Sequence, residues 1–166
     1  MEGISLVLMG SNLGQREDIM NQAVNMMLDR CGELIGKSLI YETEPWGFKA
    51  EQNFLNQVVA IRTEMTPHNL LRELMSIEKE LGRVRIGLGY QSRPIDLDIL
   101  YYDDIIINDD ELIIPHPRLQ MRRFTLLPLN DIAADFVHPI LKKTNKELLE
   151  YCEDTSEVKL YKKKLL

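Results

Sequence analysis

Residues 78–100 read E-K-E-L-G-R-V-R-I-G-L-G-Y-Q-S-R-P-I-D-L-D-I-L. This stretch leaves a helical pattern near Gly82, passes through a basic segment, and closes on an alternating run in which Asp96 and Asp98 are interleaved with apolar residues. Side chains alternate between the two faces of a β-strand, so both carboxylates would project the same way, about 7 Å apart. The stretch therefore predicts a helix that leads through a loop into a strand with two acids on one face.

The two acids follow a basic loop that contains Arg83, Arg85 and Arg93. Two like charges in an apolar strand repel each other and resist burial. A bound cation would offset both the repulsion and the cost of burial. Carboxylate oxygens are ligands that Mg²⁺ prefers, and guanidinium groups bind phosphate oxygens. The pattern favours a site where Mg²⁺ and phosphates meet; the alternative is a solvated edge strand with surface ion pairs.

Length and composition are those of a single globular domain. The chain has 166 residues, 45% of them hydrophobic and 28% charged, and a net charge of −6 that argues against general nucleic-acid binding. Its two cysteines, Cys31 and Cys152, indicate neither a disulfide framework nor a zinc site. No apolar run is long enough to span a membrane, so we expect a cytoplasmic protein. We expect one domain over residues 1–152, with residues 153–166 as a C-terminal extension, an extra edge strand or a loose tail.

The order of predicted elements indicates an α+β protein. Strand patterns at residues 4–9, 34–43, 53–62 and 95–99 are separated by helical patterns at residues 19–31 and 66–81. This order predicts a ferredoxin-like βαββαβ core, an antiparallel-rich sheet with helices packed on it in an α/β/α arrangement. Beyond it we expect a hairpin partner at residues 105–107, a short extended piece at 112–114, and short helices at 130–135 and 144–151. Many different functions occur on this fold, so the fold alone does not indicate a function.

Several other residues are candidates for ligand contacts. Asn56 lies among apolar neighbours and would bind a heterocycle or be a satisfied structural amide. Trp46, in a Pro/Gly loop, would belong to a lid or to a loop tucked onto the core. Glu78 leans towards the buried side of its helix, where it would reach a ligand or pair with an arginine. His116 lies between two prolines, which would aim it at a ligand, although a lone histidine is often structural.

These motifs, in this order, resemble the 6-hydroxymethyl-7,8-dihydropterin pyrophosphokinase family of folate biosynthesis, from about residue 4 to about residue 150. The resemblance rests on Gly10-Ser11-Asn12, Tyr41-x-Thr43-x-Pro45-x-Gly47, Phe54-Leu55-Asn56, Glu78, Gly82-Arg83-x-Arg85, Arg93-Pro94-Ile95-Asp96-Leu97-Asp98-Ile99, Pro115-His116 and Arg122-x-Phe124. It implies transfer of the terminal two phosphates of ATP to the hydroxymethyl oxygen of the pterin, which leaves AMP.

The resemblance also implies roles for individual residues. Asp96 and Asp98 would hold two Mg²⁺, and Arg83 and Arg93 would stabilise phosphate charge. Contacts to ATP, the co-substrate, are implied for Glu78, Arg85, Ile99, His116 and Arg122. Contacts to the pterin are implied for Thr43, Pro45, Trp46, Phe54, Asn56, Tyr90 and Phe124.

The sequence departs from the family pattern at several positions, and none of them is a metal ligand. Tyr90-Gln91-Ser92 stands where a Trp-Gly-Pro run is frequent, and Glu111 stands where some members have an arginine. We expect a monomer whose partners are small molecules, with neither nucleic acid nor membrane among them. Two other functions fit the residues: a different Mg²⁺-dependent nucleotidyl or phosphoryl transferase, and a non-catalytic ligand-binding module.

Overall fold

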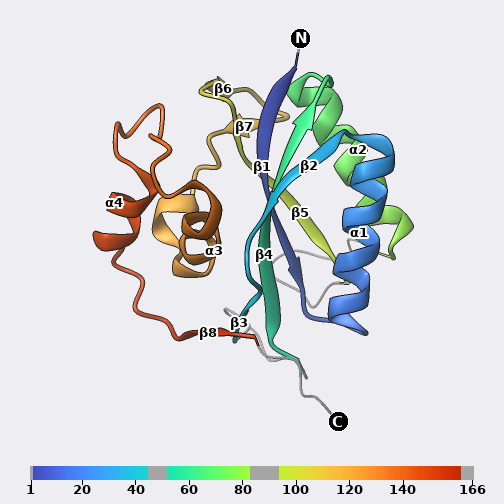
Figure 1. Ribbon diagram of the computed structural model, residues 1–166, viewed down its shortest axis with the longest axis horizontal. Coiled ribbons are helices and arrows are strands. Elements are labelled where there is room, and N and C mark those ends of the chain that lie inside the picture. The colour runs from blue at the N-terminus through green and yellow to red at the C-terminus, as the bar shows by residue number, and fades with distance from the viewer. Residues whose placement is uncertain (1, 45–51, 83–93, 162–166) are drawn as a thin grey trace.

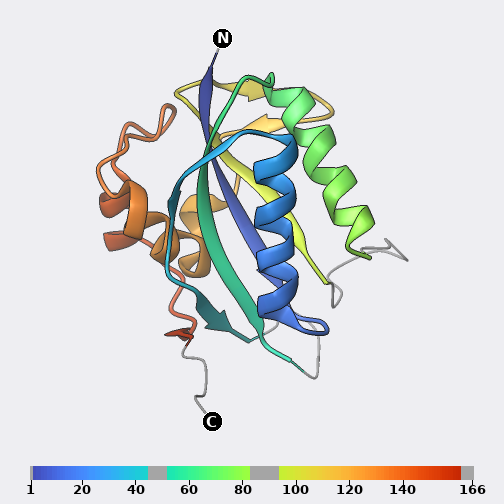
Figure 2. The ribbon, with the colours of Figure 1, turned by 45° about the vertical axis from the view of Figure 1, so that its right-hand side comes forward.

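A six-stranded antiparallel sheet forms the middle layer of the described structure (Figures 1 and 2). The computed structural model describes residues 2–44, 52–82 and 94–161. The strands of the sheet are β1 (Gly3–Ser11), β2 (Glu33–Lys37), β3 (Tyr41–Thr43), β4 (Phe54–Thr63), β5 (Asp96–Tyr102) and β8 (Val158–Leu160). Their order is β5-β1-β4-β3-β8, and β2 also pairs with β4. Since β2 and β3 share one neighbour, the core has the ferredoxin-like order, as predicted.

Helices cover both faces of this sheet. On one face lie α1 (Arg16–Arg30) and α2 (Pro67–Glu80), and on the other lie α3 (Arg123–Ala133) and α4 (Asn145–Glu150) (Figure 1). A short 3₁₀ helix at Leu119–Met121 precedes α3, and a small separate sheet is formed by β6 (Ile107–Asn108) and β7 (Ile113–Ile114). None of the helices in the described ranges is long and apolar enough to cross a membrane.

The central strand β1 is apolar on both sides because both sides are covered. Val7 and Met9 belong to a first core shared with α1 and α2. Leu6 and Leu8 point the other way, into a second core that includes residues of α3. The continuous apolar run of β1 thus supplies two cores at once, as expected for a strand buried on both faces.

The helix α2 begins and ends where the sequence predicts. The Thr66 hydroxyl accepts a hydrogen bond from the backbone N–H of Asn69, and Pro67 occupies the first helical position. After the last turn Gly82 has a φ of 97°, a left-handed conformation that glycine adopts without steric cost. The end of the helix lies beside the edge of β5.

The segment predicted as one strand over residues 34–43 is two strands. Ser38 interrupts it, because the Ser38 hydroxyl accepts the backbone N–H of Val58 at 2.9 Å and takes the place of a ladder carbonyl. The Ser38 carbonyl accepts a hydrogen bond from the side chain of Gln57 instead. This break lets β3 continue along β4 as a separate short strand.

Two expectations after β5 were wrong. Residues 105–107 were expected to pair with the aspartate strand, but β6 pairs with β7. A helix was expected at residues 130–135, but α3 begins at Arg123 and contains Pro128. Leu126 and Leu129, three positions apart, are fully buried on one side of this helix, and that burial outweighs the break that a proline predicts.

Candidate active site

Asp96 and Asp98 lie at the beginning of β5, on one face of the sheet. In the register with β1, Asp96 is opposite Gly10 and Asp98 is opposite Leu8. The intervening Leu97 is 4% exposed and packs in the first core, on the opposite face. The two carboxylates are half-buried and face the side of α3, so the predicted alternation of the strand is confirmed.

Gly10 keeps the sheet face open beside these acids. A row of cross-strand neighbours runs from Asp96 through Gly10 and Asn56 to Tyr41. A Cβ atom on Gly10 would lie 3.5 Å from Oδ1 of Asn56, so without it nothing from this residue rises above the backbone. Neighbouring strands are about 4.8 Å apart, which puts Asp96 and Asn56 about 10 Å from each other across the sheet.

On the far side of Gly10, Asn56 and Thr43 form a buried polar pair. The Asn56 amide nitrogen donates to the Thr43 hydroxyl at 3.1 Å, and the two residues are 3% and 9% exposed. Phe54 is the cross-strand neighbour of Thr43 and lies on the same face. The structure thus brings together three residues that the sequence analysis assigned to one substrate.

The buried Glu78 holds the edge of β5. Its carboxylate accepts the backbone N–H of Leu97 at 2.8 Å, between the two aspartates. Among the strands that the structure describes, β1 alone pairs with β5, so this N–H points away from β1, towards α2. Sequence reasoning missed this contact because nothing in either segment shows that α2 ends beside this edge.

The side chain of Ile99 lies in the first core and is 4% exposed. Its backbone, two residues after Leu97, shares the outward orientation of that residue. Any ligand contact of Ile99 is therefore through its main chain, at the edge of β5 that faces away from β1.

His116 is held by two backbone contacts. Its N–H donates to the Leu100 carbonyl at 2.9 Å, and its ring Nδ1 accepts the backbone N–H of Arg118 at 3.1 Å. Burial, Arg122 and Arg118 lower the pKa of His116 to about 4, while Asp96 acts in the opposite direction. The ring is therefore neutral at pH 7 with its proton on Nε2, a hydrogen-bond donor close enough to Asp96 and Arg122 to feel their charges.

The start of α3 carries the next pair. The Arg122 guanidinium lies over the Phe124 ring, 5.5 Å from its centroid, and both side chains are half-buried. Phe124 packs against the second core, on the face that holds the aspartates. A flat half-buried ring at the end of a helix can stack on a planar ligand.

Six predicted site residues lie outside the described ranges: Pro45, Trp46, Arg83, Arg85, Tyr90 and Arg93. The departure at Glu111 can be located, since its carboxylate pairs with Arg72 of α2 at 3.1 Å. Arg72 of α2 thus lies beside Glu111, in the segment between β6 and β7.

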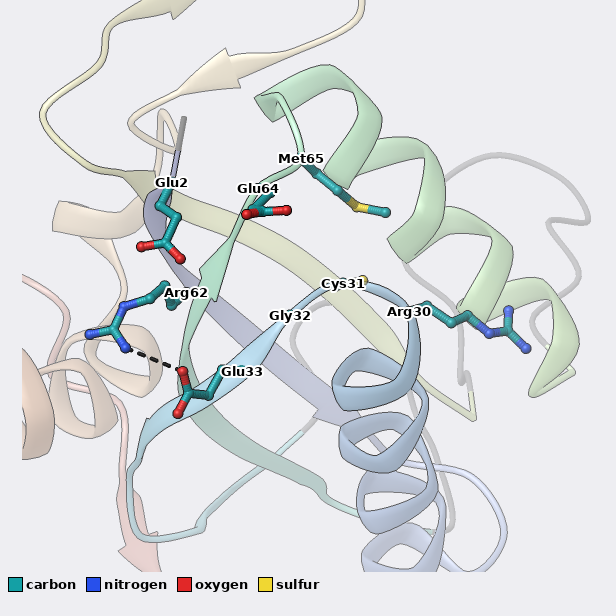
Figure 3. A pocket seen from close by; sticks show the side chains of 8 residues that line it. All are labelled: Glu2, Arg30, Cys31, Gly32, Glu33, Arg62, Glu64 and Met65. Carbon is teal, nitrogen blue, oxygen red and sulfur yellow. Dashed lines mark hydrogen bonds and ion pairs between the residues drawn. The ribbon is translucent and has the colours of Figure 1, made fainter.

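A cavity of about 470 Å³ lies at the other end of the sheet (Figure 3). It is lined by Glu2, Arg30, Cys31, Gly32, Glu33, Arg62, Glu64 and Met65. Arg62 and Glu33 form an ion pair there at 3.2 Å, and Arg30 pairs with Glu80 at 2.6 Å. None of the predicted site residues that fall within the described ranges lines this cavity.

Comparison with known proteins identifies the family. Residues 6–134 match the family model described as 7,8-dihydro-6-hydroxymethylpterin-pyrophosphokinase (HPPK). A 2-amino-4-hydroxy-6-hydroxymethyldihydropteridine pyrophosphokinase of Porphyromonas gingivalis is 43% identical over 134 residues, 79% of this chain and 90% of the relative. One of Bacillus subtilis is 36% identical over 165 residues, 99% of this chain and 93% of the relative.

Solved structures share the fold. A crystal structure of an HPPK-DHPS protein in complex with substrates has a TM-score of 0.74 and 17% identity, and covers 90% of this chain. A Plasmodium falciparum HPPK-DHPS structure has a TM-score of 0.76 and 18% identity. This chain spans 43% and 44% of those two longer chains. With its family model, its relatives and its fold in agreement, the chain belongs to the 7,8-dihydro-6-hydroxymethylpterin-pyrophosphokinase family of enzymes.

Proposed function

We propose that this chain transfers diphosphate from ATP to the hydroxymethyl group of 6-hydroxymethyl-7,8-dihydropterin and depends on Mg²⁺. The hydroxymethyl oxygen gives up its proton to solvent and bonds to the β-phosphorus, the bond between that phosphorus and the α,β-bridging oxygen breaks, and AMP leaves with that oxygen. The observation that carries the proposal is the row Asp96-Gly10-Asn56, an acidic end and an amide end separated by open sheet face.

The acidic end fits a divalent cation. Mg²⁺ in phosphate-transfer sites is usually bound by one or two carboxylates together with substrate phosphates, and Asp96 and Asp98 supply that donor set on one face. When bound, two Mg²⁺ would neutralise phosphate charge and favour approach of the hydroxyl group. Because both carboxylates extend from one strand, they would hold the cations in a fixed relation to Gly10.

ATP would be gripped from the His116 side of the site. The neutral His116 ring donates from Nε2 to a phosphate oxygen, and Arg122 adds a positive charge. Ile99 offers main-chain groups at the edge of β5 to the nucleotide. Arg83 and Arg93 would stabilise the charge that shifts between phosphates, and Arg85 would contact the nucleotide, as the family resemblance implies.

The pterin would lie over Gly10, towards Asn56. Its heterocycle edge would exchange hydrogen bonds with Asn56 and Thr43, whose side chains are already aligned by their own contact. Phe124 would stack on the ring plane from the α3 side. We also propose that Pro45, Trp46, Phe54 and Tyr90 complete the pterin contacts, and that the chain works as a monomer, since its own helices cover both faces of the sheet.

The direct test supplies ATP, Mg²⁺ and the reduced hydroxymethylpterin and separates the nucleotide products. AMP in equal amount to the pterin diphosphate supports the proposal, whereas ADP, or no turnover, rejects it. ADP would indicate a different Mg²⁺-dependent phosphoryl transferase.

Asp96→Asn tests the metal role in the same assay. We expect it to lower the rate by about 10²–10³, the usual cost of losing one group that stabilises charge in such a site. The matched control is Asp104→Asn, which removes an exposed carboxylate in the turn after the same strand and should leave the rate unchanged. Equal rates for the two variants would reject a catalytic role for Asp96.

A further inference from the structure

Residues 152–161, which we call the C-terminal strap, run from the end of α4 to the edge of the sheet beside β3 (Figure 1). They lie beyond residues 6–134, the part of the chain that matches the family model. The strap contacts two elements that carry proposed pterin contacts, the start of α3 and the strand β3.

At the first contact, Asp154 caps α3. The backbone N–H of Arg123, between Arg122 and Phe124, donates to Oδ2 of Asp154 at 2.9 Å. Arg122, the residue at the N-cap position, makes no side-chain capping hydrogen bond. The first N–H groups of a helix have no partner within the helix, and a carboxylate there also complements the helix dipole. Asp154, 31 positions from Arg123 in the sequence, thus caps the helix in place of a local side chain.

The Asp154 carboxylate is itself held in place. Its Oδ1 accepts the backbone N–H of Ser156 at 2.9 Å and the Ser156 hydroxyl at 2.6 Å. Burial opposes ionisation of this group, but the hydrogen bonds from Ser156 and Arg123 outweigh it and lower the pKa of Asp154. The cap is therefore a charged and oriented acceptor at neutral pH.

At the second contact, β8 forms the outer neighbour of β3. Val158 lies opposite Thr43, Lys159 opposite Glu42, and Leu160 opposite Tyr41. Antiparallel pairs alternate between hydrogen-bonded and non-hydrogen-bonded positions. The Tyr161 N–H donates to the Ile40 carbonyl at 2.9 Å, so the Lys159–Glu42 pair two residues along is a hydrogen-bonded position. Val158 then faces Thr43 at a close, non-hydrogen-bonded position on the site side.

An arginine joins the same corner from the other face. Arg16 donates to the Glu42 carboxylate at 3.0 Å and to the Asn53 carbonyl at 2.7 Å, and its guanidinium lies 5.8 Å from the Tyr161 ring centroid. β3 has only three residues, and without β8 it would be an edge strand held, among the described strands, by β4 alone. Short edge strands pair weakly, so β8 restrains the strand that presents Thr43.

We propose that the C-terminal strap positions the two halves of the pterin site relative to each other, with Asp154 and β8 as the positioning groups. Asp154 sets where α3 begins and hence where Phe124 lies, and β8 sets β3 and hence the Thr43–Asn56 pair. The strap itself touches no reacting atom. This inference rests on the proposed function, because it concerns the pterin side of the same site.

Two variants remove the two contacts separately. Asp154→Ala deletes the cap, and Lys159→Pro deletes an N–H at a hydrogen-bonded position of β8. Asp154→Asn, which keeps an acceptor oxygen, and Lys159→Ala, which keeps the N–H, are their matched controls. Thr144→Ala removes the capping box of α4 and lowers stability without touching the strap, so it controls for general destabilisation.

The measurements are the Kd of the pterin and the Kd of a non-hydrolysable ATP analogue with Mg²⁺, by titration calorimetry on the full chain. We expect Asp154→Ala and Lys159→Pro to weaken pterin binding roughly tenfold, or about 1.4 kcal/mol, with ATP-analogue binding changed less than about twofold. The controls, including Thr144→Ala, should bind the pterin like the unaltered chain. In turnover, the KM for the pterin should rise more than kcat falls.

Three results of the titrations overturn the inference. Equal loss of pterin and ATP-analogue affinity would mean that the strap only stabilises the fold, as would a loss no larger than that of Thr144→Ala. If the unaltered chain binds pterin but produces no AMP, the proposed reaction is rejected. The pterin titrations of the variants still test whether the strap positions the pterin site. If the unaltered chain does not bind pterin, both proposals are overturned.

Discussion

At the scale of single residues, Gly10 determines how much room lies between Asp96 and Asn56. A Cβ there would make ordinary van der Waals contact with Oδ1 of Asn56, at 3.5 Å, and with the Phe54 ring, at 3.9 Å. An alanine is thus compatible with the fold, but its methyl group would stand where the proposed substrates meet. A substitution at residue 10 can therefore affect the site without disrupting the fold.

Gly10→Ala should therefore keep or raise stability while lowering activity. Replacing a strand glycine by alanine restricts the unfolded chain and stabilises by about 0.4–1 kcal/mol where the backbone conformation is compatible. A displaced substrate, in contrast, can cost up to about 10² in rate. Thermal unfolding and turnover measured on one preparation check both effects. A variant with full activity would contradict the position given to the pterin.

His116 makes a prediction about stability and pH. Its pKa is about 4 in the folded protein and 6.5 when unperturbed, so the unfolded state binds more protons between these pH values. The free energy of unfolding should therefore fall as the pH falls from about 6.5 towards 4, and the contribution of the neutral ring is complete above 6.5.

His116→Asn removes this titration, so its stability should decline less over the same interval. Urea unfolding of both proteins at pH 7 and pH 5 measures the two declines. His138, whose pKa burial also lowers, is present in both proteins and cancels in the comparison. Parallel declines would show that His116 is charged or exposed in the folded state.

At the scale of elements, α2 and β5 are joined by the hydrogen bond from Leu97 to Glu78. The carboxylate lies in the last turn and a half of α2 and reaches the one backbone N–H between Asp96 and Asp98. It therefore couples the end of the helix to the orientation of both acids. A buried carboxyl group needs hydrogen-bond partners, so the contact serves the helix as much as the strand.

Glu78→Ala should lower the free energy of unfolding by about 1–3 kcal/mol, because the Leu97 N–H loses its charged acceptor. Glu78→Gln keeps an acceptor oxygen and should lose less. Because β5 would also lose its edge contact, we expect weaker Mg²⁺-dependent ATP-analogue binding in the alanine variant. Urea unfolding and titration calorimetry measure the two effects, and an alanine variant unchanged in both would refute the coupling.

At the scale of the whole molecule, one sheet separates two cores, and its central strands contribute to both. Leu74 of α2 lies in the first core and Leu129 of α3 in the second, and both are fully buried. Strands β1 and β4 place alternate side chains in each core. Neither core can therefore lose its packing without disturbing the strands that support the other.

Leu74→Ala and Leu129→Ala should each cost about 2–5 kcal/mol, and each should shift a single unfolding transition. Far-ultraviolet circular dichroism, followed in a urea series, should give one cooperative transition for each variant. A curve with two transitions would mean that the two layers of helices unfold independently.

The sequence determined the local features of this protein. The alternation of Asp96 and Asp98 with Leu97, the proline start and glycine end of α2, and the order of strands and helices are all short-range patterns. They decide which face a side chain takes and which fold class the chain joins, because backbone geometry has a period of two or 3.6 residues. The motifs of the family are also short patterns along the chain, so the sequence alone was enough to identify them.

Only the tertiary structure decided which distant residues meet. The Asp154 cap on Arg123, the Leu97–Glu78 contact and the break at Ser38 join residues that no local pattern relates, since each depends on where the chain returns in space. The helix over Pro128 formed against its local signal because burial of Leu126 and Leu129 outweighed it. Periodicity fixes the orientation of a side chain, whereas its partners follow from packing, and packing is a property of the whole chain.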